Sequence, residues 1–194
     1  SSTKSIGATA LGLALQDGTL MLDDPAQMHL PVLGTPPASN VNTGWLDDIS
    51  VLHLATQTAG FDKPGGYTSL VFQPGTRWSY TDGGANWLAD LLTTVFNADL
   101  NAVLFTRAFT RMGITTADLT WRSNAYREDT LNGVKRREFG AGISANANAM
   151  SRIGYLYVRR GVWAGERLLP DVFIEQVQKP AQSVAGVPMR DPTN

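Results

Sequence analysis

Apolar residues recur at helical spacing from the start of the chain, over residues 2–17. They cover one face and extend most of the way round, at Ile6, Ala10, Leu11, Leu13, Ala14 and Leu15. A helix that is apolar nearly all round is a buried helix, and Gly18 suits the left-handed conformation that closes one. The small residues Gly7, Ala8 and Gly12 also predict close approach by neighbouring backbones. We therefore expect residues 2–17 to form a buried helix.

Further helices are predicted along the chain, separated by long loops. Residues that favour helix starts stand at Asp24, Ser50, Asp82, Asp99, Ser144 and Asp171. The helix after Asp82 carries its predicted core face on Trp87, Leu88, Leu91, Leu92 and Val95. Residues 32–48 and 61–79 are rich in Gly and Pro and predict loops, and residues 113–138 are polar and irregular, with short strands possible. The pattern predicts a mostly helical chain.

The composition is that of a single globular domain. The chain has 194 residues, of which 43% are hydrophobic and 17% charged. Its net charge of −1 comes without a long run of one sign, so we expect no nucleic-acid partner and no anionic membrane surface. No apolar stretch approaches the roughly 18 residues of a membrane span. Cysteine is absent and only His29 and His53 are present, so we expect no disulfide, no thiol catalysis, no metal centre and no cofactor.

Both ends of the sequence predict a fragment. The chain opens on a helix start, without an initiator Met or a targeting segment, and closes on Pro188, Pro192 and Asn194 without a packed element. A signal peptide would lie upstream of Ser1. The compartment and the oligomeric state stay open.

Ser1 and Lys4 are the first candidates for chemistry. Positions three apart share a helix face, so the Lys4 amine can lie near the Ser1 hydroxyl. A serine is a poor nucleophile until a neighbouring base takes its proton, and a buried lysine can serve as that base. The helix start also offers free N–H groups to a developing oxyanion. The alternative is that Ser2 or Thr3 is simply an N-cap, without chemistry.

Tyr80 and Asp82 form a second candidate pair, between Pro74-Gly75 and Gly83-Gly84. A tyrosine in a tight turn before a helix can direct its hydroxyl into a cleft, where a nearby ammonium would stabilise its phenolate. In the alternative reading, Tyr80 is a half-buried loop aromatic and Asp82 an ordinary N-cap.

Four segments in order resemble the serine hydrolases of the class C β-lactamase, carboxylesterase and penicillin-binding-protein (DD-peptidase) type. Ser-x-x-Lys opens the first, and the second is similar to Ile-Thr-x-x-His-Leu-Leu-Thr-His-Thr-Ser-Gly. The third resembles the family's Pro-Gly and Tyr-x-Asn motifs, and the fourth its Gly-x-Trp-x-Gly-x-x-Leu-Leu ending. The segments are SSTKSIGATALGLALQDGTLMLDDP, ISVLHLATQTAG, FQPGTRWSYTDGGANWLADLL and FGAGISANANAMSRIGYLYVRRGVWAGERLLP.

The resemblance implies an α+β fold of the β-lactamase/transpeptidase type. Residues 1–194 would be a mostly helical part of that domain, with the nucleophile helix but without most of the central antiparallel sheet. It also implies a bacterial protein, cytoplasmic or periplasmic/secreted, that hydrolyses a small-molecule ester or amide through an acyl-enzyme.

The resemblance further assigns roles to individual residues. Ser1 would be the acylated nucleophile, Lys4 its general-base partner, and Tyr80 a group that shares the proton transfer. The Ser1 main-chain N–H would be one oxyanion donor, and the second donor would come from a later strand. Asp82 and Trp121 are candidates for substrate binding, although core packing is an equal alternative for Trp121.

Two departures from the family pattern bear on the substrate. Asp82 stands where the family usually has Asn, and a carboxylate cannot donate as an amide does. The third motif, Lys-Thr-Gly or His/Trp-x-Gly, is absent from this chain and would lie beyond it. Because of Asp82, an esterase-like or β-lactamase-related enzyme is preferred over a true β-lactamase.

The remaining candidates receive structural interpretations. The resemblance implies a structural role for His53, which argues against a Ser-His-Asp triad. His29 is interpreted as a loop or surface residue, and the run Lys135, Arg136 and Arg137 as a solvated face.

Two other functions stay open from the sequence. One is a catalytically inactive relative that keeps the fold as a binding or regulatory module. The other is an N-terminal nucleophile hydrolase, in which the Ser1 amine is the base, although its layered sheet is not predicted here.

Overall fold

The computed structural model describes residues 1–178 and 186–190 of the chain. Its longer helices are α1 (Thr3–Asp17), α4 (Asp82–Phe96), α6 (Ala147–Val158) and α7 (Asp171–Gln178). Its shorter helices are α2 (Ala26–His29), α3 (Val51–Thr56) and α5 (Leu100–Leu104), the last continued by a π turn (Phe105–Phe109) and a 3₁₀ turn (Thr110–Met112). The prediction of a mostly helical chain is confirmed.

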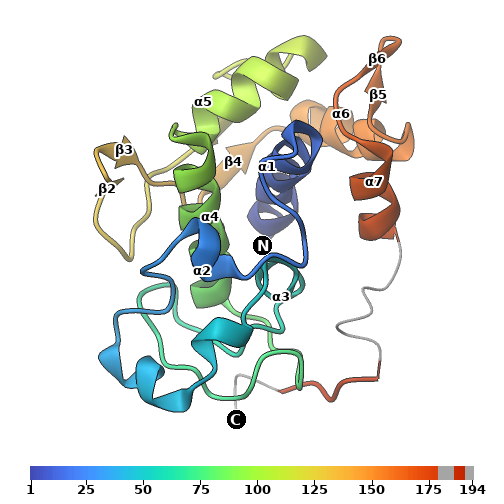
Figure 1. The fold of residues 1–194 in the computed structure, drawn as a ribbon. Coiled ribbons are helices and arrows are strands. Elements are labelled where there is room, and N and C mark those ends of the chain that lie inside the picture. Colours follow the sequence, from blue (N-terminus) through green and yellow to red (C-terminus); the bar gives the residue numbers. More distant parts are fainter. Residues whose placement is uncertain (179–185, 191–194) are drawn as a thin grey trace.

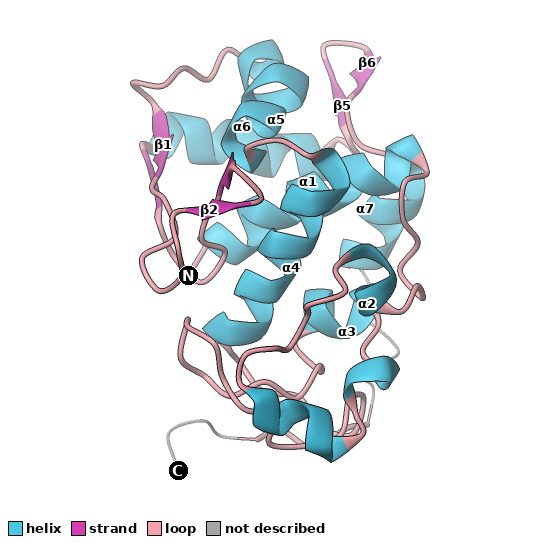
Figure 2. Ribbon diagram, turned by 60° about the vertical axis from the view of Figure 1, so that its left-hand side comes forward, coloured by secondary structure: helices cyan, strands magenta, loops and turns pink. Residues whose placement is uncertain are grey.

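Strands are few and short in the described part of the chain. They are β1 (Leu119–Trp121), β2 (Thr130–Leu131), β3 (Val134–Lys135), β4 (Ile143–Ala145), β5 (Val162–Trp163) and β6 (Glu166–Arg167). They form three two-stranded antiparallel sheets, β1 with β4, β2 with β3, and β5 with β6 (Figure 2). The short strands expected within residues 113–138 are thus present.

Helix α1 runs through the centre of the molecule (Figure 1). It packs against α4, α5 and α7, and its apolar residues Ile6, Leu11 and Leu13 are at most 3% exposed. Gly18 ends α1 in the left-handed conformation, with φ of 66°. The buried helix and its glycine stop were both predicted correctly.

The small residues of α1 make room for aromatic rings rather than for neighbouring backbones. A Cβ atom at Gly7 would lie 2.9 Å from the Phe139 ring, and one at Gly12 would lie 2.6 Å from the Phe173 ring. The expectation of close backbone approach was therefore wrong. Because these two glycines have no side chains, the Phe139 and Phe173 rings pack directly against α1.

Three predicted helix starts need correction. Pro25, not Asp24, is the N-cap of α2, and no side chain caps that helix. Thr81 caps α4 by accepting from the Gly84 N–H at 3.2 Å, so Asp82 is the first helical residue and its carboxylate is free for another partner. Asn146 caps α6, whereas Ser144 lies in strand β4. The caps at Ser50 and Asp99 were predicted correctly, since each accepts a hydrogen bond from a main-chain N–H of its helix.

The predicted loops are present, although residues 32–48 include two 3₁₀ turns, Ala38–Thr43 and Leu46–Asp48. Residues 186–190 return to the loop that carries Trp78, where Met189 pairs with Trp78 in an isolated parallel bridge. The expectation of an unpacked end is therefore wrong at Pro188, whose carbonyl accepts from the Trp78 N–H at 3.1 Å. Pro192 and Asn194 lie outside the described residues.

The basic run at 135–137 is not a solvated face. Only Lys135 is exposed. The Arg136 side chain is 6% exposed and pairs with Asp90 at 3.2 Å, and the Arg137 side chain is 11% exposed and pairs with Asp99 at 2.5 Å. A charged residue is buried when partners surround it, and those partners lie far away in the sequence.

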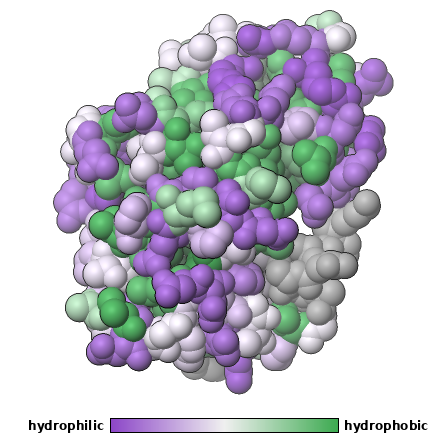
Figure 3. Space-filling model, in the orientation of Figure 1, coloured by the Kyte–Doolittle hydropathy of each residue, from purple (hydrophilic) through white to green (hydrophobic). Residues whose placement is uncertain are grey.

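The surface seen in Figure 3 carries hydrophobic residues in separate patches among hydrophilic ones. Within the described residues, no single helix is both long and apolar enough to cross a bilayer. Helix α4 and the segment Leu100–Met112 reach that size only together, across a bend of 72°.

Candidate active site

The site begins at the first turn of α1. The Ser1 hydroxyl donates to the Gly140 carbonyl oxygen at 3.1 Å and accepts from the Thr3 N–H at 3.3 Å. The Ser1 main-chain nitrogen also contacts the Tyr80 hydroxyl oxygen. The Ser1 hydroxyl therefore lies next to a main-chain carbonyl, and the main-chain nitrogen of the same residue lies next to a phenol.

Lys4 extends toward the same carbonyl. Its Nζ atom donates to the Gly140 oxygen at 2.9 Å and to the Tyr80 hydroxyl oxygen at 3.2 Å, and it forms an ion pair with the Asp82 carboxylate. Three acceptors around Nζ match the three N–H donors of an ammonium group. Among the described residues, Lys4 makes no direct hydrogen bond to the Ser1 hydroxyl, and the two groups meet through their shared acceptor.

Tyr80 is held in place by Gln57, at the C-terminal end of α3. The Ser79 N–H donates to the Gln57 carbonyl oxygen at 3.1 Å, and the Thr81 N–H donates to the Gln57 side-chain oxygen at 2.7 Å. Gln57 adopts the left-handed conformation with φ of 62°, which is uncommon outside glycine. One residue thus fixes the main chain on both sides of Tyr80.

Asp82 faces Lys4 from the first turn of α4. Its N–H donates to the Lys63 carbonyl oxygen at 2.9 Å, and its side chain is 33% exposed. Gly140 packs directly against it, because a Cβ atom at position 140 would lie 2.8 Å from the Asp82 Cβ. Only glycine fits at 140 without displacing the carboxylate.

We name these five groups the reactive cluster: the Ser1 hydroxyl, the Lys4 ammonium, the Tyr80 hydroxyl, the Asp82 carboxylate and the Gly140 carbonyl. The structure brings together all the predicted site residues except Trp121. Sequence reasoning missed Gly140, because an acceptor on the main chain has no side-chain signature. It also missed Gln57, whose role depends on its contact with a distant loop.

Trp121 lies in the core at 4% exposure. Its ring stacks on Phe139, with centroids 5.5 Å apart, and its indole N–H donates to the Glu138 carbonyl oxygen at 2.8 Å. This placement agrees with the packing alternative. A role for Trp121 in substrate binding stays a prediction.

The two histidines lie in their own local networks. His53 Nδ1 lies 3.2 Å from the Ser50 N–H in a capping box, and burial lowers the pKa of the ring. His29 ends α2 and pairs with Asp24 at 2.8 Å, with its side chain 14% exposed, so its interpretation as a loop or surface residue was wrong. Neither histidine has a hydrogen bond to the reactive cluster in the described part of the chain.

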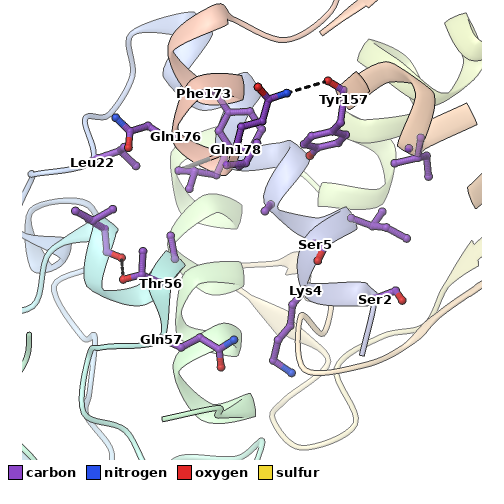
Figure 4. A pocket seen from close by; sticks show the side chains of 18 of the residues that line it. Ser2, Lys4, Ser5, Leu22, Thr56, Gln57, Tyr157, Phe173, Gln176 and Gln178 are labelled. Atoms are coloured by element: carbon purple, nitrogen blue, oxygen red, sulfur yellow. Dashed lines mark hydrogen bonds between the residues drawn. The ribbon is translucent and has the colours of Figure 1, made fainter. Parts of the chain in front are cut away.

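A groove with a volume of about 830 Å³ opens beside the cluster, between α1, α3, α6 and α7. Its lining is mostly apolar, and Lys4 is the member of the reactive cluster that reaches it. Figure 4 shows the Lys4 and Gln57 side chains extending into the same end of this groove. Over residues 1–178 and 186–190, no three His, Asp or Glu side chains gather as a metal site would require.

Comparison with known families decides the assignment. The β-lactamase family model matches residues 1–188. The chain belongs to the β-lactamase family. Serine-hydrolase-type chemistry on small esters and amides is established at the level of this family, and its fold differs from the layered sheet that an N-terminal nucleophile hydrolase requires. No curated protein sequence matches the chain.

Solved structures show the β-lactamase/transpeptidase fold. A protein assigned as a β-lactamase from Bacteroides dorei DSM 17855 superimposes with a TM-score of 0.76 at 16% identity, over 97% of this chain and 57% of its own. A penicillin-binding protein from Bacillus halodurans gives 0.68 at 16%, over 93% and 62%. The LovD6 mutant of simvastatin synthase from Aspergillus terreus gives 0.67 at 20%, over 93% and 56%.

The chain thus spans less than two thirds of the length of each of these proteins. At these identities the likeness concerns the fold alone. The mostly helical character and the three small sheets of the described residues correspond to part of the β-lactamase fold.

Proposed function

We propose that the protein is a serine hydrolase that acts through a covalent acyl-enzyme on a small ester or amide. The observation that supports this most directly is the meeting of the Ser1 hydroxyl and the Lys4 ammonium on the Gly140 carbonyl oxygen, at 3.1 Å and 2.9 Å, with the Tyr80 hydroxyl 3.2 Å from Lys4. A nucleophile and a cation that share one acceptor, with a phenol beside the cation, are groups that acyl transfer can use.

The geometry suggests how the proton moves. In the proposed step Tyr80 starts as the phenolate, which the Lys4 ammonium stabilises, and takes the proton from Ser1. The Ser1 oxygen at the same time forms a bond to the substrate carbonyl carbon, and the carbonyl oxygen takes up the negative charge. Collapse of the tetrahedral intermediate breaks the bond to the leaving group, which takes the proton from Tyr80. Water then attacks the acyl-enzyme by the same route in reverse and restores Ser1.

Asp82 bears on the substrate class. Its carboxylate pairs with Lys4 and has no N–H to offer a substrate amide, whereas an Asn at this position would have one. We therefore favour an ester substrate over a β-lactam. Asp82→Asn is expected to raise turnover of nitrocefin relative to p-nitrophenyl acetate.

The central experiment is labelling of the intact natural protein with a fluorophosphonate probe, followed by peptide mass spectrometry. Label is expected at Ser1, and Ser1→Ala should abolish it. Ser2→Ala is the matched control, because Ser2 is the neighbouring hydroxyl and its side chain makes no cap hydrogen bond. Ser2→Ala should label at nearly the wild-type rate.

A substrate panel then sorts the activity. Hydrolysis of p-nitrophenyl acetate, but not of nitrocefin or a D-alanyl dipeptide, is the expected outcome for the esterase-like enzyme. Failure of the wild-type protein to label at Ser1 would contradict the hydrolase and favour the second candidate, an inactive relative that binds a ligand without turning it over.

A further inference from the structure

Asn86 is a fully buried side chain one helical turn beyond Asp82 on α4, with 0% of its surface exposed. Its side-chain oxygen accepts from the Phe139 N–H at 2.9 Å and from the Gly140 N–H at 3.1 Å. Its amide group donates to the Gly65 carbonyl oxygen at 2.8 Å. The side chain thus joins α4 to two loops that are far apart in the sequence.

The loop at 139–142 and the first residue of β4, Ile143, are tied down from two helices. Asn86 binds two successive N–H groups at its start, and the Thr3 hydroxyl oxygen of α1 accepts from the Ile143 N–H at 3.2 Å. Between these anchors lies the Gly140 carbonyl, on which Ser1 and Lys4 both converge. These anchors hold the oxygen together with the Arg122 N–H, which donates to the Gly142 carbonyl oxygen at 3.0 Å, because a glycine has no side chain of its own to hold it.

A second asparagine makes the same kind of clamp away from the site. Asn40 is 1% exposed, donates to the Gly34 and Thr68 carbonyl oxygens at 2.9 Å and 3.0 Å, and accepts from the Leu70 N–H at 2.8 Å. Both residues therefore satisfy main-chain groups of buried loops. The difference is that none of the loop groups held by Asn40 belongs to the reactive cluster.

We propose that Asn86 is a positioning residue, which fixes the Gly140 carbonyl at the point where Ser1 and Lys4 can share it. The proposal rests on the proposed function, because the position of the Gly140 oxygen can affect a reaction rate only if Ser1 is the nucleophile. Loss of the two accepted hydrogen bonds would let residues 139–140 shift, and the acceptor that aligns the nucleophile with Lys4 would shift with them.

The test compares Asn86→Leu with Asn40→Leu in the intact natural protein. Each change removes a buried clamp of three hydrogen bonds, so each should lower the unfolding midpoint in urea. The measured quantities are the rate of fluorophosphonate labelling at Ser1 per folded molecule, and kcat and KM for p-nitrophenyl acetate. Asn86→Leu is expected to lower the labelling rate and kcat by about 100-fold with KM changed by less than about threefold, the scale of a misplaced reacting group. Asn40→Leu should leave both rates within about threefold of the wild type.

A conservative variant separates the accepted hydrogen bonds from the donated one. Asn86→Asp keeps an oxygen for the Phe139 and Gly140 N–H groups and replaces the donor to Gly65 by a second oxygen, which binds that carbonyl only when it is protonated. Its labelling rate is expected to recover at least about tenfold over that of Asn86→Leu. If the leucine variants do not fold, Asn86→Ser and Asn40→Ser are compared in the same way, since serine is smaller.

The outcomes are distinguishable. Equal labelling rates for the Asn86 and Asn40 variants, whether both high or both low, would overturn the positioning role. No recovery in Asn86→Asp over Asn86→Leu would also count against it. An unlabelled wild-type protein, by contrast, would overturn the proposed function itself.

Discussion

Two aspartates on the same helix illustrate two uses of an ion pair. Asp82 opens α4 and pairs with Lys4 while its side chain stays 33% exposed. Asp90 lies about two helical turns further on, is 1% exposed, and pairs with Arg127 at 2.7 Å and Arg136 at 3.2 Å. Each carboxylate joins α4 to a distant segment, but the partner of Asp82, Lys4, also contacts the Tyr80 hydroxyl and the Gly140 carbonyl.

The surroundings of Asp90 are closed. The Arg127 guanidinium lies 4.2 Å from the centre of the Trp87 ring and 4.7 Å from that of Tyr67, in the geometry of cation–π contacts. Burial raises the pKa of Asp90, while the two arginines act against this rise. The comparison teaches that pairing alone does not mark a site. The carboxylate of the Lys4–Asp82 pair is partly open to solvent, as the proposed chemistry requires, whereas the Asp90–Arg127 pair is closed to it.

The largest expected effect is the loss of activity in Lys4→Met. Removal of the ammonium deprives Tyr80 and the Gly140 carbonyl of their shared donor, so the rate of Ser1 labelling should fall at least about 10⁴-fold. The free energy of unfolding should change by only about 1 kcal/mol, because Asp82 is exposed enough to be hydrated. Stopped-flow labelling and urea titration measure the two quantities, and a variant that loses stability but keeps its labelling rate would reverse the comparison.

Asp90→Asn is expected to do the opposite. The change leaves the buried Arg127 guanidinium without a carboxylate and Arg136 with Glu128 alone, which costs about 3–5 kcal/mol of stability. Labelling of Ser1 per folded molecule should stay at the wild-type rate. Urea denaturation followed by circular dichroism checks the first statement, and a loss below about 1 kcal/mol would mean that this pair behaves like a surface one.

A matched pair of glycine variants sharpens the contrast within α1. Gly7→Ala and Gly12→Ala each place a Cβ atom within 3 Å of a buried phenylalanine ring, Phe139 or Phe173. Each should cost about 1–3 kcal/mol, the range for overpacked cores. Only Gly7→Ala should also slow the labelling of Ser1, because Phe139 adjoins Gly140. Equal labelling rates in the two variants would argue against this connection.

The smallest expected effect concerns the pH dependence of stability. It arises from Glu128, which pairs with Arg136 at the edge of the Asp90 network. Hydrogen bonds from the Tyr67 hydroxyl, from the main chain of Glu128 itself and from Arg136, in that order of size, lower the pKa of Glu128 from 4.5 to about 2. Because the folded-state pKa lies below the unfolded value, Glu128 stabilises the fold above pH 4.5 and loses this contribution as the pH falls toward 2. Glu128 is 70% exposed, so solvent screening keeps the contribution below about 1 kcal/mol.

Glu128→Gln is therefore expected to flatten the pH dependence of the urea midpoint in this window and to leave the labelling of Ser1 unchanged. Glu175→Gln is a control, since Glu175 pairs with Arg160 at 3.3 Å on the surface of α7. An unchanged pH dependence of the urea midpoint in Glu128→Gln would mean that Glu128 does not cause the change of stability with pH.

The parts of the site that lie in local patterns could be predicted from the sequence. The apolar helix, its stop at Gly18 and the Ser-x-x-Lys spacing follow from residues within a few positions of one another. Tyr80 and Asp82 were candidates from their own local pattern, and the resemblance linked them to Ser1 and Lys4. The structure places the Lys4 side chain against both Tyr80 and Asp82 and places Ser1 on the same Gly140 carbonyl.

Features that depend on partners distant in the sequence could not be predicted. Arg136 looks solvated in a basic run until Asp90 and Glu128 are placed beside it. Asp82 looks like an N-cap until Thr81 is seen to fill that role and free its carboxylate for Lys4. Nothing in the helical pattern distinguishes Asn86, because its hydrogen-bond partners belong to two loops that are distant in the sequence.

The main-chain acceptor at Gly140 has a consequence for mutational scanning. Every substitution at position 140 retains the carbonyl, and every one introduces a Cβ atom that collides with Asp82. A side-chain scan would therefore record a requirement for small size there and would leave the hydrogen bonding invisible. Replacing the amide between residues 140 and 141 by a backbone ester weakens the Gly140 carbonyl as an acceptor without adding an atom at Cα. This change measures the contribution of the carbonyl's hydrogen bonds, which side-chain substitutions do not alter.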